Sequence, residues 1–177
     1  MPSELGDKQN LFFWYKKFGP FYTQFHPSLF IVALIYLRRF RGSPVCKNNQ
    51  PLLDSDPDPF DPRLASSSFL VLSSALTLAM QMQEDEDGLV TFDKGFNDVY
   101  KELYPEERML TQGDWDAMHI HFFLSIDCRG WVSRKEYVGV VEELLEVYHQ
   151  GDNSLQGFMD DLIKIPGACE KENQLGD

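Results

Sequence analysis

Two runs of apolar side chains on either side of Gly130 constrain the fold of this chain more than any other feature. The first run consists of Trp115, Met118, Phe122, Phe123 and Ile126. The second consists of Tyr137, Val140, Val141, Leu144, Leu145 and Tyr148. Both follow the three- and four-residue spacing of an amphipathic α-helix. Residues 115–148 are therefore predicted to form a helix, a tight bend and a second helix, with the two apolar faces packed against each other.

The bend fits the twelve-position loop of an EF-hand, which has oxygen ligands at positions 1, 3, 5, 7, 9 and 12 and a glycine at position 6. With Gly130 at position 6 as the predicted turn residue, position 5 is Arg129, which offers no carboxylate. The candidate ligands are Ser125, Asp127, Trp131 through its carbonyl group, Ser133 and Glu136. Only two of them are carboxylates, and affinity for a divalent cation falls as ligand charge is lost. The site is therefore expected to be weak or vestigial.

A second candidate loop covers residues 83–94 and has Gly88 at position 6. Its candidate ligands are Asp85, Asp87 and Thr91. Position 12, which normally holds a bidentate glutamate, is Lys94, whose ammonium group repels a cation. This loop is also expected to bind an ion weakly or not at all.

These loops resemble an established family. The run 122–127 followed by Glu136 resembles the third hand of the sarcoplasmic calcium-binding proteins, which belong to the EF-hand superfamily, and the run 87–92 resembles their second hand. The resemblance implies an all-α fold in which paired helix–loop–helix units form one compact domain. It also implies reversible binding of calcium or magnesium, which the substitutions in both loops oppose.

The remainder of the chain divides by composition. Residues 1–41 are aromatic and basic, with helices expected near 11–22 and 27–40, and are interpreted as a degenerate first hand. Residues 42–63 are rich in proline and aspartate and are predicted to be a linker without helix. Residues 64–177 form the acidic, EF-hand-like body.

Charge and hydropathy narrow the range of partners and compartments. The net charge of −12 disfavours nucleic acid, because phosphate would be repelled. The apolar run 29–37 is too short to cross a bilayer, so membrane association is the less favoured reading. The first residues lack the basic start of a secretory signal, and the three cysteines form no disulfide framework. A cytoplasmic protein is expected.

No catalytic motif is evident, because the sequence has neither a glycine-rich phosphate loop nor a nucleophile elbow. We therefore expect a non-enzymatic module that needs no cofactor and binds a protein partner, either an amphipathic helix or an acidic surface. The predicted partner cleft is lined by Trp14, Trp115, Phe122, Phe123 and Tyr137. Two alternatives stay open: a sensor or buffer that binds calcium or magnesium weakly, and a carrier of a small hydrophobic ligand.

Overall fold

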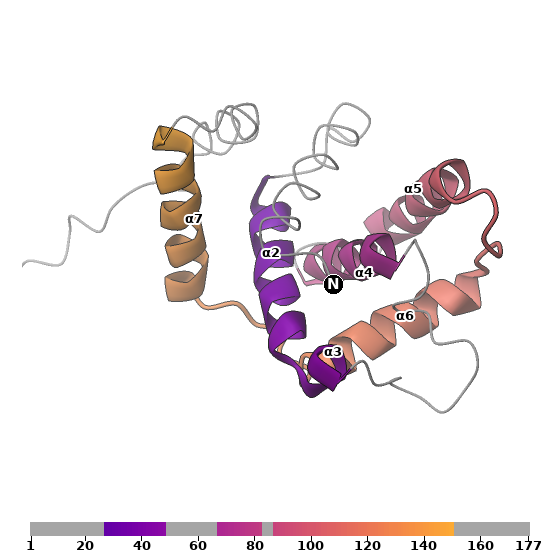
Figure 1. Cartoon of the computed structure of the whole chain (residues 1–177), viewed down its shortest axis with the longest axis horizontal. Coiled ribbons are helices and arrows are strands. Elements are labelled where there is room, and N and C mark those ends of the chain that lie inside the picture. The colour runs from indigo at the N-terminus through magenta and orange to yellow at the C-terminus, as the bar shows by residue number, and fades with distance from the viewer. Residues whose placement is uncertain (1–26, 49–66, 83–86, 151–177) are drawn as a thin grey trace, which may run out of the picture.

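The computed structural model describes residues 27–48, 67–82 and 87–150, and only the backbone for residues 87–94. These ranges contain α2 (Pro27–Gly42), α3 (Pro44–Asn48), α4 (Ser67–Gln81), α5 (Asp87–Leu103), α6 (Gln112–Ser125) and α7 (Arg134–His149). No strand occurs in this part of the chain, which confirms the prediction of an all-α structure for it (Figure 1).

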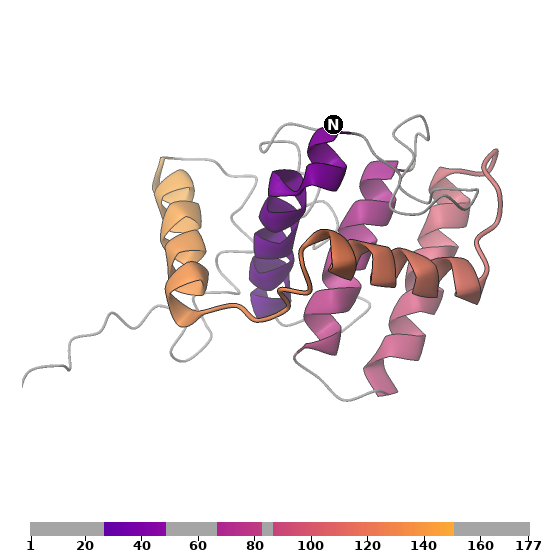
Figure 2. The same ribbon diagram turned by 90° about the horizontal axis from the view of Figure 1, so that it is seen from below.

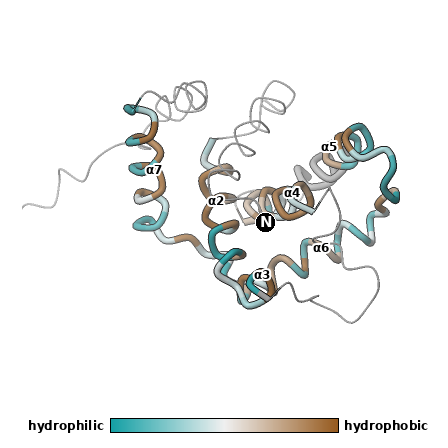
Figure 3. The backbone as a smooth tube through the Cα atoms, in the orientation of Figure 1, coloured by the Kyte–Doolittle hydropathy of each residue, from teal (hydrophilic) through white to brown (hydrophobic). Residues whose placement is uncertain are grey.

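Helices α2 and α4 form the centre of the molecule. Helix α4 consists of apolar and small residues on every side and is buried from Phe69 to Met80. Helix α2 is buried in the same way from Leu29 to Leu37, and its hydrophilic residues lie at its C-terminal end (Figure 3). A helix that is apolar all round has to be covered all round. The two helices lie side by side and make the most extensive helix contact in the described part of the chain.

The other long helices cover this central pair. Helices α5 and α6 pack on α4, whereas α7 packs on the opposite side of the pair, on α2 (Figure 2). Aromatic rings join the layers. Phe96 of α5 stacks on Trp115 of α6 with ring centres 6.4 Å apart, and Phe40 of α2 stacks on Phe122 of α6 at 5.3 Å. One continuous core results.

The predicted helix–bend–helix is present, but its two helices do not pack as expected. Helix α6 ends at Ser125, the bend follows, and α7 begins after the N-cap residue Ser133. The apolar face of α6 contacts mainly α4 and that of α7 mainly α2. The expectation that the two faces pack chiefly on each other is therefore wrong, because the largely apolar central helices cover them instead.

Two further predictions can be compared with the structure. The helix expected at 27–40 is α2, whereas the one expected at 11–22 lies outside the described residues. The linker prediction is wrong at Pro44–Asn48, which is the short helix α3. Proline is well tolerated in a first helical turn, and the Ser43 hydroxyl accepts a hydrogen bond from the Cys46 N–H at 3.3 Å.

A membrane-spanning helix is not found in the described ranges, since none of their helices combines the necessary length with sufficient apolar character.

Candidate functional site

The bend between α6 and α7 is made by two residues in the left-handed conformation. Asp127 has φ 56° and Cys128 has φ 55°, values that side chains other than glycine adopt rarely. Their amide groups donate hydrogen bonds to the carbonyls of Leu124 and Phe123, each at 3.0 Å, and so close the end of α6. The expectation that Gly130 supplies the sharp turn is wrong, because its φ lies outside the left-handed region.

Gly130 is needed for space instead. A β-carbon at this position would lie 3.0 Å from Met82 Cε and 3.3 Å from a ring carbon of Phe123, both closer than ordinary contacts. Its carbonyl oxygen also accepts a hydrogen bond from the hydroxyl of Tyr36, a buried residue of α2. The loop is thus fitted closely against the rest of the protein on two sides.

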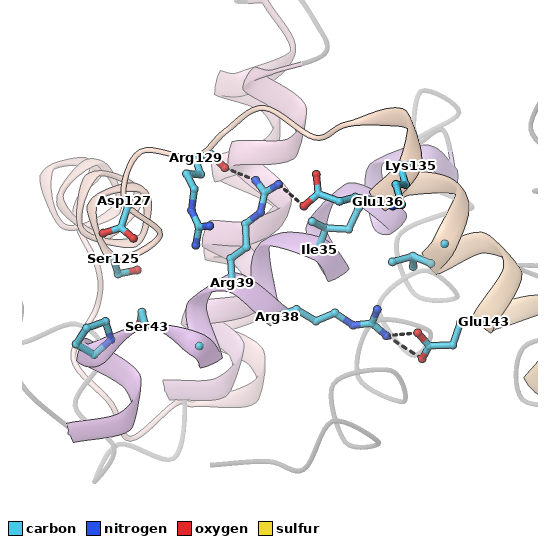
Figure 4. A pocket seen from close by; sticks show the side chains of 14 residues that line it. Ile35, Arg38, Arg39, Ser43, Ser125, Asp127, Arg129, Lys135, Glu136 and Glu143 are labelled. Carbon is cyan, nitrogen blue, oxygen red and sulfur yellow. Dashed lines mark hydrogen bonds and ion pairs between the residues drawn. The ribbon is translucent and has the colours of Figure 1, made fainter.

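The guanidinium group of Arg39 joins the loop to α7. It donates one hydrogen bond to the carbonyl oxygen of Arg129 and another to Glu136 Oε1, the latter at 2.8 Å (Figure 4). We call these two contacts the Arg39 bridge. The side chain of Arg39 is only 11% exposed, and its guanidinium carbon lies 5.8 Å from the ring centre of Tyr36. Such a cation is held by several groups at once rather than by a single surface ion pair.

Glu136 is fixed by its own helix as well. Its second carboxylate oxygen accepts hydrogen bonds from the Ser133 N–H at 3.0 Å and the Ser133 hydroxyl at 2.9 Å, while the Ser133 oxygen accepts from the Glu136 N–H. This is a capping box, which satisfies free donors at the start of α7. Hydrogen bonds from Arg39 first, and then from Ser133, lower the Glu136 pKa from 4.5 to about 2.

The predicted ion ligands of this loop do not converge on one point. The Ser125 hydroxyl is buried and donates to the Phe122 carbonyl at 2.6 Å. The Asp127 side chain is exposed, and the guanidinium groups of Arg39 and Arg129 lie between it and Glu136 in Figure 4. Within the described residues, no three His, Cys, Asp or Glu side chains are grouped closely enough to hold a metal ion.

The second predicted loop has a different shape from the one expected. Helix α5 begins at Asp87, so the backbone of Asp87, Gly88 and Thr91 is helical rather than part of a twelve-residue loop. Asp85 lies outside the described residues, and for residues 87–94 the structure describes the backbone alone. The helix start agrees with the acidic residues there, since carboxylates favour a helix N-terminus.

An open cleft lies beside the Arg39 bridge, between α2 and α7, with a volume of about 670 Å³. Two ion pairs cross between its walls, one from Arg39 to Glu136 at 2.8 Å and one from Arg38 to Glu143 at 2.7 Å (Figure 4). The two glutamates are seven residues apart and therefore lie on one face of α7. We call this space the α2–α7 cleft.

The residues predicted to line a cleft lie elsewhere. Trp115 and Phe122 are 1% and 0% exposed and fill the core, so they face no open space. Phe123 and Tyr137 are half-buried against the same core, and Trp14 lies outside the described residues. The prediction failed here because large aromatic side chains with helical spacing are the ones that a core takes up first.

Sequence reasoning did not identify Tyr36, Arg38 and Arg39 as partners of the loop. The run Arg38-Arg39 was visible as the basic end of an apolar helix, and Glu136 and Glu143 were visible seven residues apart. Their complementary charge was the available signal. The arginines and the glutamates are 97 and 105 residues apart in the chain, so the sequence did not show which of them pair.

Comparison with known proteins returned no match to a family model, to a curated protein or to a solved structure.

Proposed function

We propose that this chain is a non-enzymatic, EF-hand-like module that binds a partner protein, and that Arg39 rather than a metal ion holds its loop in shape. The observation that supports this most is the Arg39 bridge. Its guanidinium group reaches Glu136, the residue that would ligate an ion at position 12, and the Arg129 carbonyl at position 5. A positive charge from α2 is thus paired with the carboxylate that an EF-hand would use as its position-12 ligand.

The charge around the loop supports the same proposal. Asp127 and Glu136 are its only carboxylates, and Glu136 is already neutralised by Arg39. Arg129, Arg134 and Lys135 lie in or next to the loop and would repel a divalent cation. A loop closed from within the protein needs no change in calcium concentration to reach its final shape.

The surface next to the loop supports a protein partner. Trp131 is 80% exposed, and Ile120 and Leu124, one turn apart on α6, are more than half exposed. Exposed tryptophan is uncommon on a free surface and frequent at protein interfaces. The neighbouring basic residues Arg129 and Lys135 favour an acidic partner, because opposite charges steer association.

Calorimetry tests the metal part of this proposal. Titration of the full chain with calcium and with magnesium is expected to give no binding heat at concentrations up to about a millimolar, the range in which even weak EF-hands bind. Binding in the micromolar range would contradict the proposal and favour a calcium sensor.

Affinity capture tests the partner part. We compare the wild-type chain, Trp131→Ala and the matched control Met109→Ala, which removes another apolar side chain that is 53% exposed. A protein that binds the wild type and the control but not Trp131→Ala, and that rebinds in purified form, supports the proposal. If every captured protein binds all three chains equally, the Trp131 surface is not the docking site.

A further inference from the structure

We propose that the α2–α7 cleft binds a small amphiphilic anion, a carboxylate or a phosphate attached to a short apolar body. The cleft shares Arg129 and Lys135 with the surface beside Trp131, but binding of a small anion there requires no protein partner.

The cleft is framed rather than filled. The two ion pairs, Arg39–Glu136 and Arg38–Glu143, start from adjacent residues of α2 and reach points two helical turns apart on α7 (Figure 4). Between them the walls leave a volume of about 670 Å³. Pockets that take small organic ligands have volumes of about 300–1,000 Å³, so the space suits a ligand of that size.

Two glycines leave this space open, although the packing of the described residues does not require a glycine at either position. Gly139 and Gly42 both line the cleft, and a β-carbon at either position would meet no atom of the described residues within 4 Å. Gly139 lies inside α7, where alanine would favour the helix more. The missing side chain therefore brings no internal contact, and its effect is to leave room between the two ion pairs.

The charges that face the cleft favour an anion. Its lining carries the cations Arg38, Arg39, Arg129 and Lys135 and the carboxylates Asp127, Glu136 and Glu143. Glu136 and Glu143 are already engaged by the two arginines of α2. That leaves Arg129 and Lys135 against Asp127, an excess of one positive charge in a chain whose net charge is −12.

The apolar part of the lining indicates the body of the ligand. Ile35 of α2, Pro44 of α3 and Val140 of α7 all contribute to the walls. An anion of this class would place its charged group near Arg129 or near Lys135, which lie on opposite sides of the Arg39–Glu136 pair in Figure 4, and its hydrocarbon part along these apolar side chains. Burial of the hydrocarbon part supplies affinity, and the charged group supplies selectivity.

Calorimetry of the full chain with four probes of equal chain length tests the class of ligand. Octanoate and octyl phosphate are expected to bind, while octanol and octylamine bind at least about tenfold more weakly because they lack the negative charge. Inorganic phosphate alone is expected to bind at least about tenfold more weakly than octyl phosphate. Equal binding of octanol, or of inorganic phosphate, would overturn the proposal.

Variants locate the site. Gly139→Leu fills the cleft and is expected to abolish binding of octanoate, whereas the matched control Gly113→Leu, on the exposed first turn of α6, is expected to bind as the wild type does. Lys135→Gln should weaken binding about threefold to tenfold, and Asp127→Asn should strengthen it by a similar factor. Unchanged binding in Gly139→Leu with a native circular-dichroism spectrum would overturn the assignment to this cleft.

Discussion

Replacing Glu136 by glutamine tests the Arg39 bridge directly. Glutamine keeps the size of the side chain and can still serve in a capping box with Ser133, because glutamine is accepted at this position. The substitution therefore removes the negative charge that faces Arg39 and little else. We expect Glu136→Gln to lower the free energy of unfolding, equally with calcium and with a chelator.

The magnitude follows from the pKa of Glu136. A fall from 4.5 to about 2 corresponds to about 3.4 kcal/mol in full. The side chain of Glu136 is 47% exposed, however, so solvent screens much of this energy, and we expect a loss of about 1–1.5 kcal/mol. Urea unfolding of the wild type and the variant at pH 7, followed by circular dichroism, measures the difference.

The pH dependence of unfolding checks separately that ionised Glu136 stabilises the folded state. The folded-state pKa of Glu136 is lowered, so its contribution is fully present above about pH 4.5 and is lost as the pH falls towards about 2. The difference between wild type and Glu136→Gln should be constant above pH 5 and should shrink below pH 4.5. Carboxyl NMR titration gives the pKa itself, and a value of 4.5 or higher would refute the reasoning.

The matched control is Asp114→Asn in α6. Asp114 holds the same capping-box position after Thr111 and also pairs with an arginine, Arg108 at 2.9 Å. The side chain of Arg108 is 57% exposed, against 11% for Arg39, so the Asp114 pair is screened more strongly. We expect a loss below about 0.5 kcal/mol for this charge. Equal losses of unfolding free energy in the two variants would show that the Arg39 bridge stabilises the protein no more than an exposed ion pair does.

The remaining predictions concern the loop and the cleft, and urea unfolding at pH 7 measures each. Tyr36→Phe removes the hydroxyl that donates to the Gly130 carbonyl and should cost about 1–2 kcal/mol; a loss below 0.3 kcal/mol would exclude that bond as a stabilising contact. Gly130→Ala should lower the free energy of unfolding by only about 1 kcal/mol, because the flexible end of Met82 can move aside. Gly130→Val should lower it by about 2–3 kcal/mol, because the larger side chain also presses on Phe123. Equal losses in the two variants would contradict the close approach of these side chains to Gly130. Gly139→Ala should raise stability by about 0.5–1 kcal/mol, and a loss would mean that an unseen contact needs the glycine.

Local patterns determined the helices well. The apolar spacing before and after Gly130 predicted α6 and α7, because that spacing depends only on the pitch of a helix. The boundaries also carried signals, since Ser133 and Glu136 form the capping box that begins α7. In contrast, α3 was missed because proline was read only as a residue that breaks helices, although proline also begins them.

Packing partners could not be read from the same patterns. The stripes of α6 and α7 show that each helix needs an apolar neighbour, but they do not specify which one. Helix α4, and α2 from Leu29 to Leu37, are apolar on all sides and have a large surface to cover, so they take the central positions and separate the expected pair. The position of Trp115 in the apolar stripe likewise did not specify its neighbours, so it was predicted to line a cleft and was found in the core.

The candidate site illustrates this limit most clearly. The sequence indicated that the loop around Gly130 has only two carboxylates, Asp127 and Glu136, which is a local property of the chain. It did not indicate that Arg39, 97 residues before Glu136, would reach the Glu136 carboxylate. A loop motif specifies residues that are close together in the chain, whereas the cation that pairs with Glu136 comes from a helix that is distant in sequence.

If Arg39 rather than a calcium ion supplies the positive charge at the loop, binding of a partner protein should not depend on calcium. A calcium ion leaves when its concentration falls, whereas the guanidinium group of Arg39 is covalently part of α2 and cannot dissociate from the protein. The segment that carries Trp131 is also fixed by the hydrogen bond from Tyr36 to Gly130. A partner that docks at Trp131 would therefore meet a surface that is already in place, and binding would not have to order the loop. On this reasoning the affinity for the partner should be the same in calcium and in chelator, which distinguishes such a module from an EF-hand sensor.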